Sequence, residues 1–157
     1  MQLRTYSVSF SGVAVTAAQD FFEISPTDDK PLEITGIFIA QYSDAGDAAD
    51  ELLPWSIVRG HTTSGSGGAA ATPRPVRRST GTVGFAAETN NTTIASAGTG
   101  VTIHSDAFNV RAGIGLWFPE GHEPDCGQGD TTIVVRLLGA PADSLTMSGT
   151  VYIREAG

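Results

Sequence analysis

Residues 32–42 read LEITGIFIAQY, and this stretch decides the fold class. Its middle is apolar at consecutive positions, as in a strand that is buried on both faces at the centre of a sheet. Gly36 interrupts the run, and a glycine inside a strand marks a bulge or the close approach of another segment. We therefore expect a central β-strand here, within a β-rich domain.

Similar patterns lie on both sides of this stretch. Residues 4–10 alternate between apolar and polar side chains, which is typical of a half-buried strand. Residues 131–138 read TTIVVRLL and predict another central strand, while residues 145–154 read LTMSGTVYIR and predict a closing strand. Shorter strand candidates between turn residues occupy the rest of the chain, and no amphipathic helix is evident.

The expected fold is therefore all-β. About eight to ten strands with intervening turns predict a single antiparallel β-sandwich of jelly-roll type, with little or no helix. The chain of 157 residues is long enough for one domain with a proper core, so residues 1–157 are predicted to form a single domain.

Composition excludes several classes of protein. A net charge of −8 makes binding of nucleic acid over the whole surface unfavourable, because phosphates would be repelled. Cys126 is the only cysteine, so no disulfide can form within the chain. No apolar run is long enough for a transmembrane helix, and the N-terminal residues lack the apolar core of a signal peptide.

One segment differs from the rest in charge. Residues 60–80 read GHTTSGSGGAAATPRPVRRST, and no Asp or Glu occurs between Glu51 and Glu88. The acid-free window instead contains four arginines: Arg59, Arg74, Arg77 and Arg78. A basic island on an acidic chain suits self-assembly or an acidic partner. The alternative is a solvated basic loop without a partner.

The same segment is predicted to be a long loop, and loops of this length are usually functional or disordered. Residues 64–71 are expected to be flexible because they consist of small residues. Residues 73–78 are expected to be stiff and extended, because proline fixes its own φ and restricts the preceding residue. We predict that the four arginines dock onto carboxylates of a neighbouring molecule, since the planar guanidinium binds carboxylates through two hydrogen bonds.

The search for catalytic motifs is negative. The chain has no G-x-S-x-G elbow and no glycine-rich phosphate loop. His104, Ser105 and Asp106 are the residue types of a hydrolase triad, but triad members come from separate segments. We therefore expect a non-enzymatic protein with no catalytic residues and no cofactor.

Two clusters could in principle bind a metal. His122, Glu123, Asp125 and Cys126 contain ligand types, but their spacing matches no standard site, and a polar turn explains them equally well. The acids of residues 44–51 could bind Ca²⁺, although a solvated acidic loop is the simpler interpretation. No metal site is therefore predicted.

The tryptophans bear on sugar binding. Trp55 and Trp117 could line a saccharide groove if both were exposed. Both lie in apolar strand patterns, so we expect both to be buried.

The strands of residues 6–24, 31–44 and 131–157, together with RGHTTSGSGG and TPRPVRR, resemble a group of small proteins encoded near the head genes of tailed bacteriophages and prophages. The resemblance covers nearly the whole chain. It implies a virion structural protein that is made in the bacterial host cytoplasm and placed on the capsid surface as a decoration, or cement, protein. Such proteins are β-rich and frequently trimeric, so the implied partners are the major capsid protein and copies of the chain itself, with neither nucleic acid nor membrane.

Two other functions remain open at this point. A tail-fibre or receptor-binding module that recognises carbohydrate would need an exposed aromatic platform. A small cupin-type enzyme would need a cluster of metal-binding histidines, and the chain contains only His61, His104 and His122.

Overall fold

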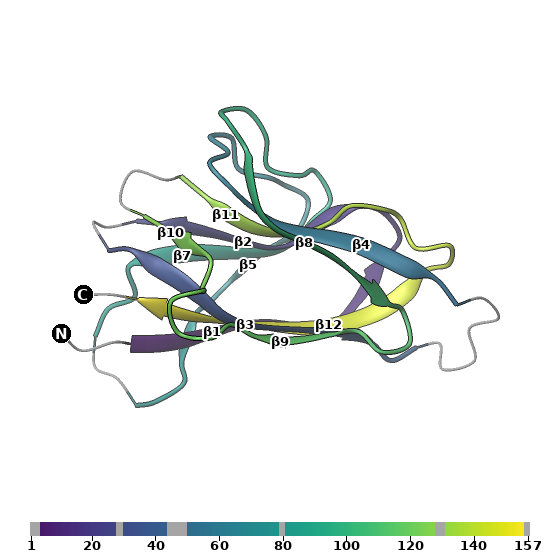
Figure 1. Cartoon of the computed structure of the whole chain (residues 1–157), viewed down its shortest axis with the longest axis horizontal. Coiled ribbons are helices and arrows are strands. Elements are labelled where there is room, and N and C mark those ends of the chain that lie inside the picture. The colour runs from purple at the N-terminus through teal and green to yellow at the C-terminus, as the bar shows by residue number, and fades with distance from the viewer. Residues whose placement is uncertain (1–3, 28–29, 44–49, 79–80, 128–130, 156–157) are drawn as a thin grey trace.

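The computed structural model describes residues 4–27, 30–43, 50–78, 81–127 and 131–155. They form two antiparallel sheets packed face to face, so the predicted antiparallel β-sandwich is confirmed (Figure 1). No helix occurs in these ranges, and accordingly none that could span a membrane. The more detailed expectation of a jelly roll stays a prediction.

Six strands form each sheet. The first sheet contains β1 (Arg4–Val15), β3 (Leu32–Gln41), β6 (Arg74–Pro75), β9 (Ile114–Trp117), β10 (Asp125–Cys126) and β12 (Leu145–Glu155). The second sheet contains β2 (Gln19–Pro26), β4 (Leu52–Arg59), β5 (Ala69–Ala71), β7 (Phe85–Asn91), β8 (Val101–Asn109) and β11 (Ile133–Leu137).

In the first sheet, β12 lies between β1 and β3, and β6 extends the sheet beyond β1. β9 and β10 both pair with the other edge of β3, so β6 and β10 lie at opposite edges. Side chains of β12 alternate strictly between buried and half-buried, as expected for a strand with one face on the core. The outer face therefore carries the polar members of this alternation.

The second sheet has the order β5-β7-β2-β11-β4-β8. All five residues of β11 are buried, which confirms the prediction of a central strand there. One face of β11 packs on the core. The other face is covered by connecting segments, which are described below.

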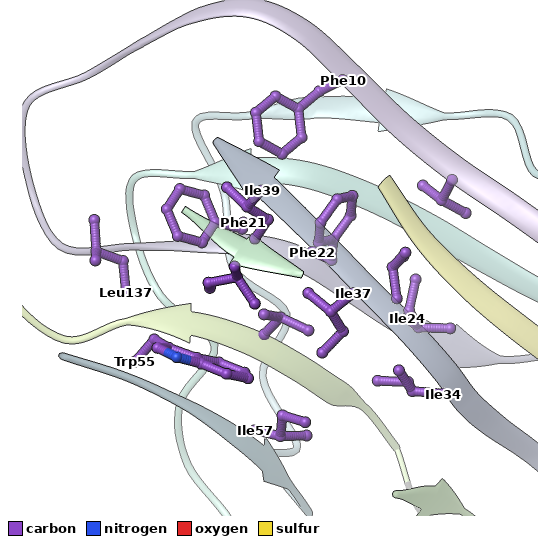
Figure 2. Packing of buried hydrophobic residues seen from close by; sticks show 14 of the residues in the cluster. Phe10, Phe21, Phe22, Ile24, Ile34, Ile37, Ile39, Trp55, Ile57 and Leu137 are labelled. Atoms are coloured by element: carbon purple, nitrogen blue, oxygen red, sulfur yellow. The ribbon is translucent and has the colours of Figure 1, made fainter. Parts of the chain in front are cut away.

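The core lies between the two sheets and is built from large aliphatic and aromatic side chains. Figure 2 shows ten of them by name: Phe10, Phe21, Phe22, Ile24, Ile34, Ile37, Ile39, Trp55, Ile57 and Leu137. Phe10 stacks on Phe21 at a centroid distance of 6.1 Å and packs against Phe22 at 5.3 Å. Both sheets contribute to this single cluster, which fixes their relative position.

The predicted interruption at Gly36 is confirmed. The pairing of β12 with β3 shifts between Tyr152 and Ile153, so β3 bulges next to Gly36. Strand β7 ends at Asn91, and Thr93 and Ser96 beyond it form only isolated bridges.

Candidate binding surfaces

The segment of residues 60–80 is not the long unpaired loop that the sequence predicts. Residues 60–68 run antiparallel to residues 92–98, with isolated bridges between Thr63 and Ser96 and between Ser66 and Thr93. Ala69–Ala71 then forms β5 beside β7. Small residues suggested flexibility, but here they allow two backbones to approach closely.

The two paired segments, which we call the twin loops, repeat one motif. Thr62, Thr63, Ser66 and Gly68 fit the pattern T-T-x-x-S-x-G, and the same pattern recurs thirty residues later from Thr92. Positive φ angles occur at matching positions, at Gly60 and Asn90 and again at Gly67 and Ala97. Thr63 of one loop pairs with Ser96 of the other, and their counterparts Ser66 and Thr93 pair in the same way. The twin loops are therefore related by an approximate twofold rotation.

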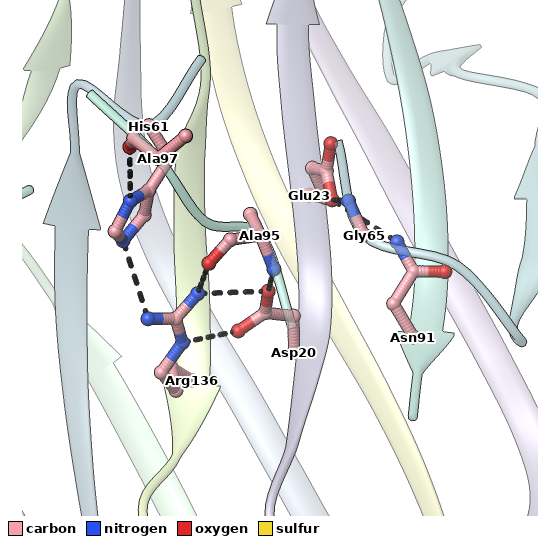
Figure 3. A network of polar contacts seen from close by, with 8 residues as sticks. All are labelled: Asp20, Glu23, His61, Gly65, Asn91, Ala95, Ala97 and Arg136. Atoms are coloured by element: carbon pink, nitrogen blue, oxygen red, sulfur yellow. Dashed lines mark hydrogen bonds and ion pairs between the residues drawn. The ribbon is translucent and has the colours of Figure 1, made fainter. Parts of the chain in front are cut away.

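Two buried carboxylates of β2 hold the twin loops in place. Gly65 N donates to Glu23 Oε2 over 2.9 Å, and Ala95 N, at the matching position, donates to Asp20 Oδ2 over 2.7 Å. Glu23 also accepts from Asn91 Nδ2 at 3.0 Å (Figure 3). Ser64 Oγ donates to Glu23 as well, at 2.6 Å. Each loop therefore satisfies a backbone donor with a charged acceptor, which is a strong type of hydrogen bond.

Arg136 connects this network to β11. Its guanidinium pairs with Asp20 through two contacts of 2.5 and 3.0 Å, and it donates to Ala95 O at 2.8 Å (Figure 3). His61 Nε2 lies 3.2 Å from Arg136 Nη1, and Nδ1 lies 3.1 Å from Ala97 O, which fits a neutral ring with its proton on Nδ1.

A small second apolar cluster lies beneath one twin loop. Val58 of β4 and Val134 of β11 are buried against Ala95. The loop therefore covers the outer face of the second sheet at this point. This explains why β11 is buried on both faces.

Residues 73–78 form an exposed cationic strap along the first sheet. Arg74 and Pro75 pair with Ser7 and Tyr6 of β1, and Val76 N donates to Thr5 O at 2.9 Å. Arg74 and Pro75 are therefore extended, as predicted for the stretch of residues 73–75. Pro75 has no N–H, which suits the outermost strand of a sheet.

The strap presents three of the four predicted interface arginines. Arg74, Arg77 and Arg78 are exposed, and none of them forms an ion pair with any of the described residues. Arg59 is not brought together with them. It forms an ion pair with Asp125 of β10, at the sheet edge opposite the strap.

Trp117 departs from the prediction that both tryptophans are buried. Trp55 is 2% exposed in the core, whereas Trp117 is 59% exposed on the outer face of the first sheet. The indole lies over Gly36, where a Cβ atom would overlap the ring. Burial was predicted from the apolar neighbours of Trp117, but those neighbours face the core and Trp117 faces outward.

Trp117 belongs to an aromatic cluster. Its ring lies nearly parallel to that of Tyr152, with centroids 5.0 Å apart and an interplanar angle of 28°. Phe38 contacts both rings edge-on, at 5.0 Å from Trp117 and 6.1 Å from Tyr152. We call these three residues the aromatic platform.

A charged group borders the aromatic platform. Arg154, two residues beyond Tyr152 on β12, contacts Glu33 at 2.6 Å and Glu123 at 2.6 Å. Burial opposes ionisation of Glu123, yet backbone N–H donors at Glu123 and Gly121 and the Arg154 charge outweigh it and lower the Glu123 pKa. The hydrogen bond to Glu33 is the main reason that the pKa of Arg154 is raised.

The remaining candidate residues do not converge. His104 packs against Trp55 and Phe118, whereas Ser105 and Asp106 are exposed on the same strand, so the three do not form a triad. His122 is exposed and Cys126 is buried. Within the described ranges, no three His, Cys, Asp or Glu side chains gather as they would around a metal ion.

The acidic cluster is only partly described. Asp50 pairs with Arg111 at 3.0 Å, and the Glu51 carboxylate accepts from Ala142 N at 3.0 and 3.3 Å. The other acids considered for Ca²⁺, Asp44 and Asp47, lie outside the described residues.

Two features of these surfaces were missed from the sequence. The repeated T-T-x-x-S-x-G pattern was a readable signal for the twin loops. The outward position of Trp117 had a weaker signal in Gly36, a glycine within an otherwise apolar strand. Comparisons with protein-family models, curated proteins and solved structures find no match to this chain.

Proposed function

We propose that this protein is a non-enzymatic structural protein of a bacteriophage virion, a decoration protein that sits on the capsid surface and assembles with copies of itself. The observation that carries the proposal is the cationic strap. Arg74, Arg77 and Arg78 project from a segment whose backbone is tied to β1, and the described residues leave their charges unpaired. Ordering three long side chains onto a partner costs less entropy when their backbone is already fixed.

The distribution of charge supports a head-to-tail arrangement of copies. The strap runs toward the end of the sandwich where the backbone of Arg4 in β1 lies beside Glu155 in β12, and Lys30 Nζ lies 4.0 Å from the Glu155 carboxylate at that end. The carboxylates nearby are already paired, since Glu33 and Glu123 contact Arg154.

The opposite end is acidic. β3 ends there at Gln41, where it pairs with the start of β12, away from Arg4. Asp50 and Glu51 outnumber Arg111 at this end, and Asp143 is exposed in the nearby turn that begins where Leu138 N donates to Pro54 O. Because the basic and acidic ends differ, contact between them is heterologous, and such contacts form rings such as trimers when the rotation between copies closes.

Native mass spectrometry tests the assembly step. The wild-type chain is expected to form a closed oligomer, and the triple variant Arg74→Ala/Arg77→Ala/Arg78→Ala is expected to be monomeric. Arg59→Ala, which removes an arginine at the sheet edge opposite the strap, is the control for loss of a single charge. A wild-type monomer at all concentrations, or an unchanged oligomer in the triple variant, would count against docking through the strap.

Binding to capsids tests the virion role separately. Undecorated heads of the phage that encodes the chain should bind the wild-type protein at a fixed number of copies. The triple lysine variant of the strap should bind more weakly than wild type but more strongly than the alanine variant. Lysine keeps the charge but lacks the planar fork.

A further inference from the structure

The outer face of the first sheet carries a second candidate binding surface. It consists of aromatic and hydroxyl groups, whereas the strap is cationic. The centre of this surface is Trp117, whose indole lies over Gly36 and packs against Tyr152 and Phe38. Contiguous exposed apolar patches, unlike single exposed side chains, often mark interaction sites. Here the ring is both exposed and fixed in orientation.

Fixed polar groups surround the ring on one side. The Arg154 guanidinium is held by Glu33 at 2.7 Å from Nε and by Glu123 at 2.6 Å from Nη2. Guanidinium has five N–H donors, and each carboxylate has about four acceptor positions, so both retain capacity for further hydrogen bonds. The group has one positive and two negative charges, and the side chain of Glu123 is only 5% exposed.

Hydroxyl groups line a shallow groove on the other side. The groove has a volume of about 490 Å³, and Phe38 of the aromatic platform forms part of its wall. Ser9 Oγ and Thr150 Oγ1 lie 2.9 Å apart within it, and Ser148 Oγ donates to Ser11 Oγ over 3.2 Å. Apolar and hydroxyl surfaces therefore alternate across the face.

We propose that this face binds a neutral saccharide. The C–H groups of a pyranose ring carry a small positive charge and pack on the negative face of an aromatic ring. The hydroxyl groups at the edge of the sugar need both donors and acceptors, and Arg154 with its two carboxylates provides both. This inference goes beyond the proposed virion role and does not depend on it.

Charge argues for a neutral ligand. Arg154 is already neutralised by Glu33 and Glu123, so the border of the platform carries an excess negative charge. Phosphate, sialic acid or uronic acid groups would be repelled there. The three rings also pack on one another, so they do not form an open cage around a cation.

Titration with defined oligosaccharides tests the proposal. The probes are the hexamers of glucose, mannose and N-acetylglucosamine, with a galacturonic acid hexamer as the anionic control. Isothermal calorimetry and tryptophan fluorescence should both report saturable binding of at least one neutral hexamer, with little dependence on salt. The anionic hexamer should bind more weakly than its neutral counterparts.

Three variants locate the site. Trp117→Ala should weaken binding at least tenfold, about 1.4 kcal/mol. Gly36→Val keeps every aromatic residue but displaces the indole of Trp117, so it should cause a similar loss of binding. Such a loss would show that the position of the indole matters and not only its presence. Leu52→Ala removes an equally exposed apolar side chain from the second sheet, at 70% exposure, and should leave binding unchanged.

Several outcomes of these titrations would contradict saccharide binding at Trp117. Binding of none of the neutral hexamers, preference for the anionic one, or full binding by Trp117→Ala would overturn the proposal. If Trp117→Ala instead changes the native mass or binding to heads while no hexamer binds, the face is a protein docking surface. Circular dichroism and cooperative urea unfolding establish that each variant is folded before it is titrated.

Discussion

Gly65 and Ala95 occupy matching positions in the twin loops, and the backbone N–H of each donates to a buried carboxylate of the same strand. Glu23 accepts from Gly65 and Asp20 accepts from Ala95, at 2.9 and 2.7 Å. One strand of the sandwich thus anchors two segments that lie far apart in the sequence. This converts residues that resemble a flexible linker into part of the folded domain.

The Asp20 anchor should be the most sensitive to substitution. Asp20→Ala would leave the Arg136 guanidinium, 10% exposed at its side chain, without its carboxylate partner. Loss of one partner of a buried pair typically lowers the free energy of unfolding by about 3–5 kcal/mol. Urea denaturation of the single variant should show this loss.

A double-mutant cycle controls this experiment. Asp20→Ala/Arg136→Met removes both charges and should be less destabilised than the sum of the two single variants. Additive losses would mean that the pair does not hold the loop as described.

Backbone conformation distinguishes the two loops. Ala97 has a φ of 56°, whereas the matching Gly67 has a φ of 86°. An L-residue in this region costs about 1–2 kcal/mol, while glycine adds about 0.4–1 kcal/mol of entropy to the unfolded chain. Ala97→Gly should therefore stabilise the protein by roughly 0.5 kcal/mol.

The reciprocal change should have the opposite sign. Gly67→Ala introduces an unfavourable φ and a Cβ atom that would overlap Thr92 Oγ1. It should lower the midpoint of urea unfolding, whereas Ala97→Gly should raise it. Equal effects of the two substitutions would contradict the assigned conformations.

The two tryptophans should differ in how readily their fluorescence is quenched. Acrylamide should quench the emission of Trp117 strongly and that of Trp55 weakly, because only Trp117 is exposed. Trp117→Phe should remove the accessible component and leave a blue-shifted, protected emission. If the protein with Trp117→Phe is still quenched readily, the core around Trp55 is not packed as in Figure 2.

Glu123 should contribute to acid sensitivity. Its pKa in the folded chain lies below the ordinary value of 4.5, so the unfolded chain binds more protons as the pH falls below that value. The stabilisation from Glu123 is complete above pH 4.5 and is lost as the pH falls through the lowered pKa.

Glu123→Gln tests this dependence. The difference in unfolding free energy between wild type and variant should be largest at pH 7 and should narrow below pH 4.5. Glu88→Gln, at a carboxyl group outside the Arg154 group, is the control substitution. A difference that is constant with pH would show that Glu123 is not ionised preferentially in the folded state.

Strand periodicity was enough to predict the sandwich. The apolar run around Ile37 and the alternation around Val8 are local signals of burial, and both strands form as expected. The twin loops were not predicted, because their stability comes from Asp20 and Glu23, which are distant in sequence. Composition alone cannot distinguish a glycine-rich linker from a glycine-rich segment that is paired with another backbone.

The candidate surfaces were likewise predicted only where the signal is local in the sequence. Local proline content predicted the extended strap, and its three arginines are exposed as docking requires. Arg59 lies in the same acid-free window, but its side chain pairs with Asp125 of β10, and β10 and β6 lie at opposite edges of the first sheet. Sequence proximity therefore grouped residues that the fold separates.

Co-sedimentation with undecorated heads tests the central claim most directly. The heads are incubated with wild-type chain, with Arg74→Ala/Arg77→Ala/Arg78→Ala or with Arg59→Ala, and the bound protein is quantified after sedimentation. Our account predicts saturable binding of wild type and of Arg59→Ala at one fixed ratio to the major capsid protein, and at least a tenfold loss for the triple variant, about 1.4 kcal/mol. Heads that bind no wild-type chain, or that bind the triple variant as well as wild type, would contradict it.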